Sequence, residues 1–359
     1  MSAAILGFGT ELPVNRMSQD EAAAMSADLL CGDERQKRLL TAMLRRSQVS
    51  NRHTCIPHQA AYDWVETGAE PGTSMGLSTQ QRMKLYAEHV GPLSIGAASK
   101  ALDNAGVSAA EITHLITVSC TGFDAPGFDV QLIEKLHLPR DVQRMQIGFM
   151  GCHAAINGMR VAAALANADP ASKTLLCATE LCSLHYHTQW DETLMLGNAL
   201  FADGSAAFVC GCANESQQSA YTIKATGSYL APDSTEMMSW QIGNHGFEMS
   251  LSSSVPDAIK QSLRPWLTQW LAKQGLALND IGAWAVHPGG PRILTAVEQS
   301  LELPSEALDV SRTVLREYGN MSSPTVLFIL QRMASLSIPK PCVALAFGPG
   351  LMIEAALLE

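Results

Sequence analysis

The chain has 359 residues, of which 47% are hydrophobic and 16% charged, and its formal net charge at pH 7 is −10. This is the composition of an ordinary globular protein rather than of a disordered chain. The acidic balance argues against a general binder of nucleic acid or of a membrane surface. No apolar run approaches the ~20 residues of a membrane span, and the N-terminus lacks the features of a secretory signal, so we expect a cytoplasmic protein.

Helical and strand patterns alternate along most of the chain, beginning with an expected strand at the N-terminus. The predicted helices cover residues 92–105, 152–168, 256–274, 290–301 and 320–335. The predicted strands cover residues 114–120, 174–181, 205–212, 283–288 and 343–348. Such alternation is typical of a layered α/β architecture.

The two halves of the chain repeat the same signals in the same order. The matching pairs are Gly106 and Gly275, Glu111-Ile112 and Asp280-Ile281, LPRD (138–141) and LPSE (303–306), and the segments GCHAA and GNMSS that begin at 151 and 319. We therefore expect two duplicated halves, 1–214 and 215–359, with Cys152 and Asn320 meeting near a pseudo-twofold axis.

The nine cysteines include no C-x-x-C pair. The pairs closest to metal-ligand spacing, His185-x-His187 and Cys210-x-Cys212, lack a second ligand pair, so no metal site is expected. Cys152 differs from the other cysteines because it stands at the expected start of a helix, between Gly151 and His153. Many free cysteines are simply small buried hydrophobes. A helix start and a nearby imidazolium would instead lower a thiol pKa from ~8.5 to below neutral and make a nucleophile.

Two further residues stand at positions where functional groups are often presented. His287 ends a predicted buried strand and is followed by Pro-Gly-Gly. The ends of strands are where α/β sheets carry functional groups, although a structural turn histidine is the alternative. Asn320 opens the predicted helix 320–335, with Ser322 and Ser323 in its first turn, and a simple N-cap is its alternative role.

Four segments together closely resemble the type III polyketide synthases, the chalcone synthase-like family of the thiolase superfamily, in a bacterial-looking form. These segments are GFMGCHAAINGMR, VHPGGPRIL, EYGNMSSPTVLF and FGPGLMIE. Two more, LITVSCTGFDAPGFDVQLIEKLHL and GNALFADGSAAFVCG, follow the family order, so that the resemblance covers nearly the whole chain. The resemblance implies a homodimer with a thiolase-like αβαβα fold built from two duplicated halves. It also implies that Cys152 is the nucleophile and that His287 and Asn320 are its catalytic partners.

The implied reaction joins CoA thioesters. Cys152 would take an acyl group from a starter acyl-CoA. Malonyl-CoA would lose CO₂, and its enolate, stabilised by His287 and Asn320, would attack the acyl-enzyme. Cyclisation would give an alkylpyrone or a resorcinol- or phloroglucinol-type ring. Side-chain donors suffice, so no metal or other cofactor is expected, and no nucleic acid or membrane partner is expected.

The resemblance also assigns residues around the substrate. Phe201 and Phe247 fall at the family's gatekeeper positions, Cys120 and Cys182 stand where plant enzymes often carry Thr, and His185 lies near a position that controls cavity volume. The remaining assigned residues are Ser322 and Phe347 at the cavity and Arg45 and Arg46 at the CoA phosphates. The cysteine and methionine side chains favour a medium or long fatty acyl starter over an aromatic one.

Alternative functions fit the sequence less well. A ketoacyl synthase III-like enzyme would carry different residues after His287. A hydroxymethylglutaryl-CoA synthase-like enzyme would need a catalytic glutamate upstream of Cys152, where only Glu88 is available. A non-catalytic acyl-CoA-binding homologue should have lost one of Cys152, His287 and Asn320, and none is lost.

Overall fold

The computed structural model describes residues 2–212, 219–336 and 338–359. The strands are β1 (Ala3–Glu11), β2 (Asn15–Ser18), β3 (Asn51–Thr54), β4 (His114–Ser119), β5 (Gln143–Gly148), β6 (Lys173–Leu181), β7 (Asp203–Cys212), β8 (Tyr221–Leu230), β9 (Met238–Gly243), β10 (Gly246–Leu251), β11 (Ala283–Val286), β12 (Cys342–Gly348) and β13 (Met352–Leu358). The α-helices are α1 (Gln19–Leu30), α2 (Glu34–Arg46), α3 (Ala60–Asp63), α4 (Thr79–Ala105), α5 (Phe128–Lys135), α6 (Ala154–Ala168), α7 (Met195–Leu200), α8 (Val255–Ala272), α9 (Pro291–Leu301), α10 (Asp309–Tyr318) and α11 (Pro324–Ser335). The short 3₁₀ turns are η1 (Ala109–Glu111), η2 (Gly151–His153), η3 (Cys182–His185), η4 (Leu278–Asp280) and η5 (Ser305–Leu308).

Two half-sheets are joined side by side and share the pairing pattern of their first four strands, while the first half has β5 as an additional edge strand. The strand order of the large sheet is β11-β12-β13-β8-β1-β7-β6-β4-β5. From β1 outward, the pairs β1–β7 and β7–β6 are antiparallel and β6–β4 is parallel. From β8 outward, β8–β13 and β13–β12 are antiparallel and β12–β11 is parallel. The expected duplication is therefore visible in the strand connections, while the expected boundary near residue 214 lies outside the described residues.

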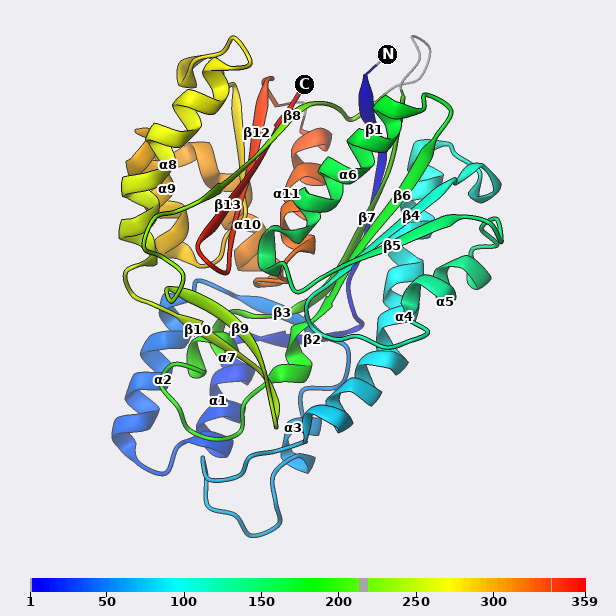
Figure 1. Cartoon of the computed structure of the whole chain (residues 1–359). Coiled ribbons are helices and arrows are strands. Elements are labelled where there is room, and N and C mark those ends of the chain that lie inside the picture. Colours follow the sequence, from blue (N-terminus) through cyan, green and yellow to red (C-terminus); the bar gives the residue numbers. More distant parts are fainter. Residues whose placement is uncertain (1, 213–218, 337) are drawn as a thin grey trace.

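Helices cover both faces of each half-sheet and produce five layers (Figure 1). On β1, Ala3 and Ile5 face the central core around α6 and α11, whereas Ala4 and Leu6 face the outer core around α4 and α5. On β12, Ala344 faces the same central core, and its neighbours on either side face the outer core around α8 and α9. Because successive strand residues point to opposite faces, each half-sheet is buried on both sides. The order is thus helices, sheet, helices, sheet, helices, and the expected αβαβα layering is confirmed.

A second region lies against one end of these layers (Figure 1). It contains α1, α2, α3 and α7, the small β2–β3 pair and the β9–β10 hairpin. The helical and strand patterns noted in the sequence did not predict this region. No helix in the described part of the chain combines the length and apolarity needed to span a bilayer.

Three predicted helix starts are corrected by the structure. The helix predicted from residue 92 begins at Thr79, after a capping box formed by Ser78 and Gln81, and runs through Pro92. The helix predicted from residue 152 begins at Ala154, because residues 151–153 form the 3₁₀ turn η2. The helix predicted from Asn320 begins at Pro324, a residue whose fixed φ and missing N–H suit the first helical turn.

Candidate active site

Cys152 lies in the tight turn η2, between β5 and α6. The turn begins at Gly151, whose φ of +77° is in the left-handed region that favours glycine. A Cβ on Gly151 would lie 2.4 Å from Cδ of Pro349, so the absence of a side chain also lets the β12–β13 loop pack against the turn. The Cys152 side chain is half-buried and borders a cavity.

The thiol of Cys152 is surrounded by hydrogen-bond donors but is not acidified. The Ser322 hydroxyl donates to Cys152 Sγ at 3.5 Å. Burial raises the pKa of the Cys152 thiol to about 11, against the opposing effect of hydrogen bonds from Ser322, Asn320 and its own backbone N–H. The expectation that the helix start lowers this pKa below neutral is therefore wrong for the protein alone. The thiol is desolvated, and α6 begins two residues later, at Ala154.

Asn320 reaches the thiol from the other half of the chain. It is buried and forms an isolated bridge with Phe201, donating its N–H to Leu200 O while Ala202 donates to its carbonyl. Its Oδ1 accepts the Ser322 N–H at 2.8 Å, which leaves the amide nitrogen available to a ligand. Asn320 thus does not cap a helix, and the structure brings Asn320, Ser322 and Cys152 together.

His287 is buried at the end of β11, in the strand layer next to the Cys152 turn. Its N–H donates to Leu345 O at 2.8 Å, and β12, which carries Leu345, packs against η2. Neither ring nitrogen has a hydrogen-bond partner within the described residues. Burial, assisted by the charge of His153, lowers the pKa of His287 to about 3, so the imidazole is neutral in the protein alone. Two unpartnered nitrogens on a buried ring indicate a group whose partner arrives with a ligand.

Glu180, which the sequence did not single out, is a buried carboxyl group that connects the two halves beside this site. It accepts the Cys120 N–H at 2.9 Å, the Thr121 hydroxyl at 2.8 Å and the Ser323 hydroxyl at 3.0 Å. Burial raises the pKa of Glu180 to about 7 despite these hydrogen bonds. Its signal in the sequence is only an acidic residue inside a buried strand pattern.

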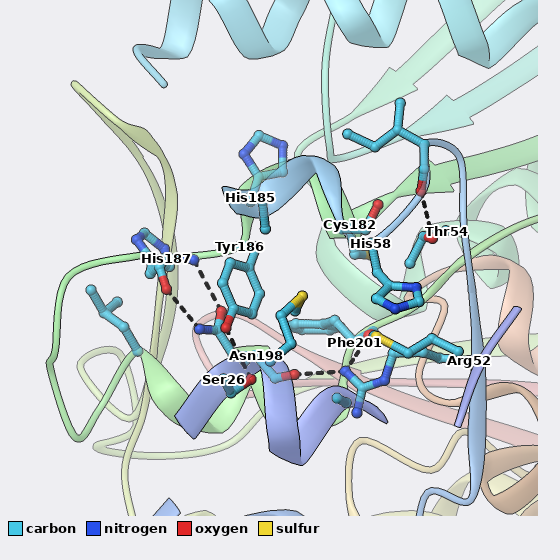
Figure 2. A pocket seen from close by; sticks show the side chains of 18 of the residues that line it. Ser26, Arg52, Thr54, His58, Cys182, His185, Tyr186, His187, Asn198 and Phe201 are labelled. Carbon is cyan, nitrogen blue, oxygen red and sulfur yellow. Dashed lines mark hydrogen bonds between the residues drawn. The ribbon is translucent and has the colours of Figure 1, made fainter. Parts of the chain in front are cut away.

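Two small, mainly apolar cavities lie near Cys152 and share part of their lining. The first, about 40 Å³, is lined by Cys120, Thr121, Gly151, Cys152, Cys182, Phe201, Met238, Ser239, Trp240, Met249, Ser322 and Pro349. The second, about 60 Å³ and shown in Figure 2, lies between η3, α1 and α3 and includes Phe201, Phe247, His185 and Cys182 in its lining. Most of the residues expected around the substrate therefore do border this pair of cavities.

Two of the expected cavity and CoA residues are placed differently. Phe347 points into the outer core around α8 and α9, because the alternation along β12 turns it away from the central layer, and Pro349 borders the cavity instead. Arg46 lines a large cleft of about 720 Å³, whereas the lining of this cleft does not include Arg45. Lys260 and Arg292, from α8 and α9, line the same cleft and were missed because their segments are far from α2 in the sequence.

The described residues contain no group of three or more His, Cys, Asp or Glu side chains arranged to hold a metal ion. Cys210 and Cys212, the cysteines at near-metal spacing, and Cys120, Cys152 and Cys182 at the cavity are all free thiols.

Comparisons with known proteins agree over the full length of the chain. The family of chalcone and stilbene synthases matches with its N-terminal domain at residues 1–214 and its C-terminal domain at residues 222–359. The alpha-pyrone synthesis polyketide synthase-like Pks18 of Mycobacterium tuberculosis is 32% identical, over 99% of this chain and 91% of its own length. The 1,3,6,8-tetrahydroxynaphthalene synthase of Streptomyces peucetius is also 32% identical, over 98% of this chain and 91% of its own. The crystal structure of PKS-I from the brown alga Ectocarpus siliculosus superposes with a TM-score of 0.91 at 32% identity, covering 100% of this chain and 98% of that one.

Proposed function

The chain belongs to the chalcone and stilbene synthase family of type III polyketide synthases, and we propose that its reaction runs on Cys152, His287 and Asn320. As a member, it is a malonyl-CoA-dependent condensing acyltransferase with a thiolase-like fold. The observation that supports these residue roles is that the thiol of Cys152, which borders the first cavity, is met by the Ser322 hydroxyl and the Asn320 amide from the other half of the chain. The buried, unpartnered imidazole of His287 completes the set.

The first step transfers the starter acyl group to Cys152. The sulfur attacks the thioester carbonyl of acyl-CoA, an S–C bond forms, and the bond to CoA sulfur breaks. The Cys152 thiol must lose its proton as the S–C bond forms. His287, whose ring nitrogens have no partner within the described residues, accepts this proton and returns it to the leaving CoA thiolate. The backbone N–H of Cys152 lies beside the reacting sulfur and can donate to the carbonyl oxygen as negative charge develops.

The second step makes the carbon nucleophile. Malonyl-CoA loses its carboxylate as CO₂, and the electron pair moves onto the thioester oxygen. The Asn320 amide N–H₂ and the Nε2–H of neutral His287 are the donors for this enolate, and removing one donor of this kind typically costs ~10²–10³ in rate. The enolate carbon then attacks the acyl-Cys152 thioester and releases the thiolate. Every step uses side-chain and backbone groups of the chain, so we propose that no resident cofactor takes part.

The CoA phosphates are proposed to bind in the large cleft. Its rim combines Arg46 on α2 with Lys260 and Arg292, and its lining includes Gly289 and Gly290 just after His287. Three cations from separate elements give an acidic protein a local site for anionic phosphates. This arrangement supports the proposal that Arg46 binds the CoA phosphates, and it adds Lys260 and Arg292 to the proposed site. Arg45 is still proposed to contact the CoA phosphates, although it does not belong to the lining of the cleft.

The starter is proposed to be a fatty acyl-CoA and the product an alkylpyrone or a resorcinol- or phloroglucinol-type ring. Thiol, thioether and aromatic side chains make up more than half of the lining of the first cavity, and the second cavity adds Met17, Met25 and Trp64. Such side chains suit an alkyl chain better than a phenol. The alpha-pyrone named for Pks18 and the polyhydroxynaphthalene named for the Streptomyces relative are both cyclised polyketides, which fits this range of products. Mass spectrometry of the products from acetyl-, hexanoyl-, decanoyl- and coumaroyl-CoA with malonyl-CoA tests the proposal. A maximum with coumaroyl-CoA would contradict the fatty starter, and no product from any starter would contradict the function.

We also propose the division into halves 1–214 and 215–359 and a homodimer located in the cytoplasm. Strand β5 lies at the edge of the large sheet with β4 as its partner, and most of its residues are exposed. Met145 on β5 and the neighbouring Phe123 and Met150 are large apolar side chains that are 49%, 42% and 41% exposed, respectively. An open edge flanked by apolar side chains is a natural surface for a second copy. Light scattering after gel filtration should give twice the chain mass of 38.5 kDa.

A further inference from the structure

We propose that Trp240 is a partition between the cavity of Cys152 and the second apolar cavity, and that the second cavity binds the far end of a straight alkyl chain on the starter. The inference rests on the proposed function, because the chain must be attached at Cys152. It adds a specificity-determining residue and a binding site for a defined chemical group.

The two cavities are separated by a shared wall. Four residues line both of them, namely Cys182, Phe201, Trp240 and Met249. Trp240 and Met249 are directly opposite each other in the β9–β10 hairpin, so a single hairpin face supplies half of this wall. Because Trp240 is the largest of the four side chains, its indole decides whether the two cavities are one space or two.

The indole is held by one hydrogen bond and by aromatic edges. Its Nε1–H donates to the Cys120 carbonyl at 2.7 Å. Its ring meets Phe247 and His185 edge-on, with centroids 5.9 Å and 5.7 Å away, and Phe201 at 6.2 Å. Edge-to-face contacts of this kind are favourable but weak. They keep the indole in one orientation without fixing it strongly.

The neighbouring residues His185 and Phe247 are held by stronger contacts than the Trp240 indole. His185 stacks on Phe247 with centroids 4.2 Å apart, and its Nδ1 accepts the Phe247 N–H at 2.9 Å. Its other nitrogen donates to Thr121 O at 2.6 Å. The His185–Phe247 pair therefore connects the hairpin to η3 and to the end of β4. Trp240 is the residue of the wall whose substitution would open a passage between the two cavities.

The second cavity offers a largely apolar surface. Its lining includes Met17, Ala22 and Met25 from β2 and α1, and Ala61 and Trp64 from α3 and the residue after it. The Tyr186 hydroxyl and Ser26 hydroxyl bond to each other at 2.9 Å and connect η3 with α1 (Figure 2). This pair sets the limit for a chain that enters past Trp240.

Several polar groups of this cavity are already engaged with the protein, and His58 also lines it. The Arg52 guanidinium donates to Asn198 O at 2.6 Å, to Ala199 O at 2.8 Å and to Phe201 O at 3.1 Å. The His187 ring bonds to Phe247 O at 3.1 Å. A ligand in the cavity therefore meets methyl, thioether and ring surfaces, which favours an unbranched alkyl chain over a polar or charged one.

The test compares how the enzyme ranks acyl chains of different length. Wild type, Trp240→Phe and Trp240→Ala are each given an equimolar mixture of hexanoyl-, decanoyl- and tetradecanoyl-CoA, and the acyl groups on the enzyme are quantified by intact-protein mass spectrometry. Product formation gives kcat/KM for each starter separately. Trp266→Ala is the matched control, because Trp266 lies on α8 and stacks on Tyr229 and Trp270, away from both cavities.

Opening the wall should shift the preference toward longer chains. Each methylene that enters an apolar site contributes about a fourfold gain, so Trp240→Ala should raise the tetradecanoyl-to-hexanoyl ratio by at least about tenfold, with a smaller rise in Trp240→Phe. Adding Ala22→Leu to Trp240→Ala fills the second cavity and should remove most of the gain. Trp266→Ala should leave the ratio unchanged.

The outcomes separate this inference from the proposed function. Unchanged ratios in Trp240 variants that still become acylated would overturn the partition and leave the function standing. A gain that survives Ala22→Leu would overturn the second cavity as the binding site. If Trp240→Ala is not acylated by any starter, Trp240→Phe decides the question. Absence of acylation in wild type would instead overturn the function itself.

Discussion

The two halves of the molecule build the same frame and place different chemistry on it. Each half has two antiparallel strand pairs followed by a parallel pair, and each has a left-handed glycine directly before its functional residue. Gly151 has φ +77° before Cys152, and Gly319 has φ +75° before Asn320. The equivalence that the sequence repeat predicted is therefore present in the backbone at the residues that matter for function.

The halves diverge in the few residues after that glycine. In the first half, a 3₁₀ turn leads into α6 at Ala154 and leaves the Cys152 thiol at the cavity. In the second half, Asn320 bridges Phe201, and the helix begins only at Pro324. A duplicated frame thus supplies two facing positions, and local backbone changes place a thiol at one and an amide at the other, the groups that we propose as nucleophile and hydrogen-bond donor.

The first half should show the strongest response to mutation. Cys152→Ala should lower polyketide formation from a starter by at least about 10³-fold, because the acyl-enzyme can no longer form. Slow decarboxylation of malonyl-CoA should persist, since His287 and Asn320 remain. Product assays with and without a starter measure both activities. Cys212→Ala, a change at a cysteine that bonds to Ala166 O away from the cavity, is the control. Polyketide formation by the Cys152 variant would show that the nucleophile is another residue.

The second half should contribute a smaller but distinct effect. Asn320→Ala and His287→Ala should each slow malonyl-CoA decarboxylation by about 10²–10³-fold, as expected for loss of one enolate donor. His287→Ala should also slow acylation of Cys152, whereas Asn320→Ala should affect acylation less. Single-turnover acylation and steady-state decarboxylation separate the two steps. Equal effects of Asn320→Ala on both steps would mean that the amide acts mainly on the thiol.

Glu180, which connects the halves, should make stability depend on pH. Its pKa is raised in the folded protein from 4.5 to about 7, so its ionised form is disfavoured by folding. The favourable contribution of Glu180 to the free energy of unfolding is complete at low pH and is lost as the pH rises through about 7. The loss amounts to roughly 3 kcal/mol. Relative to Glu180→Gln, wild type should therefore lose stability between pH 4.5 and about pH 7. Denaturant unfolding of both proteins at several pH values measures this, and a difference that does not vary with pH would contradict the assignment.

The weakest response should come from the two glycines that mark equivalent turns in the frame. Gly106 and Gly275 follow α4 and α8, have φ +61° and +77°, and leave open space within 4 Å of the point that a Cβ would occupy. Replacing either with alanine should cost only the left-handed strain, about 1 kcal/mol, and the two costs should match. Thermal and denaturant unfolding measure the loss of stability in each variant. Clearly unequal losses would contradict the equivalence of the two turns.

The sequence predicted the layered core well, because its strands are buried apolar runs and its helices follow them in a regular alternation. The segments around Cys152, His287 and Asn320 resemble those of the family, and this resemblance, rather than any one residue, implied that the three act together. The sequence misplaced helix starts, since α4 begins at Thr79 and continues through Pro92, and α11 begins only at Pro324.

The residues that the sequence could not identify act through contacts between distant segments. Glu180 takes donors from the end of β4 and from the segment before α11, and Trp240 reaches the cavity from a hairpin with no strong pattern of its own. The thiol pKa also could not be predicted, because a helix start was visible in the sequence but the burial that opposes it was not.

Starter loading and chain extension both depend on Cys152 as the residue that carries the growing chain. Wild-type protein mixed with decanoyl-CoA in the absence of malonyl-CoA, followed by intact-mass measurement and peptide mapping, examines this role without any later step. We predict one decanoyl group per chain, located on the peptide that contains Cys152 and absent from Cys152→Ala. A decanoyl group on Cys120 or Cys182, or no covalent adduct at all, would contradict it.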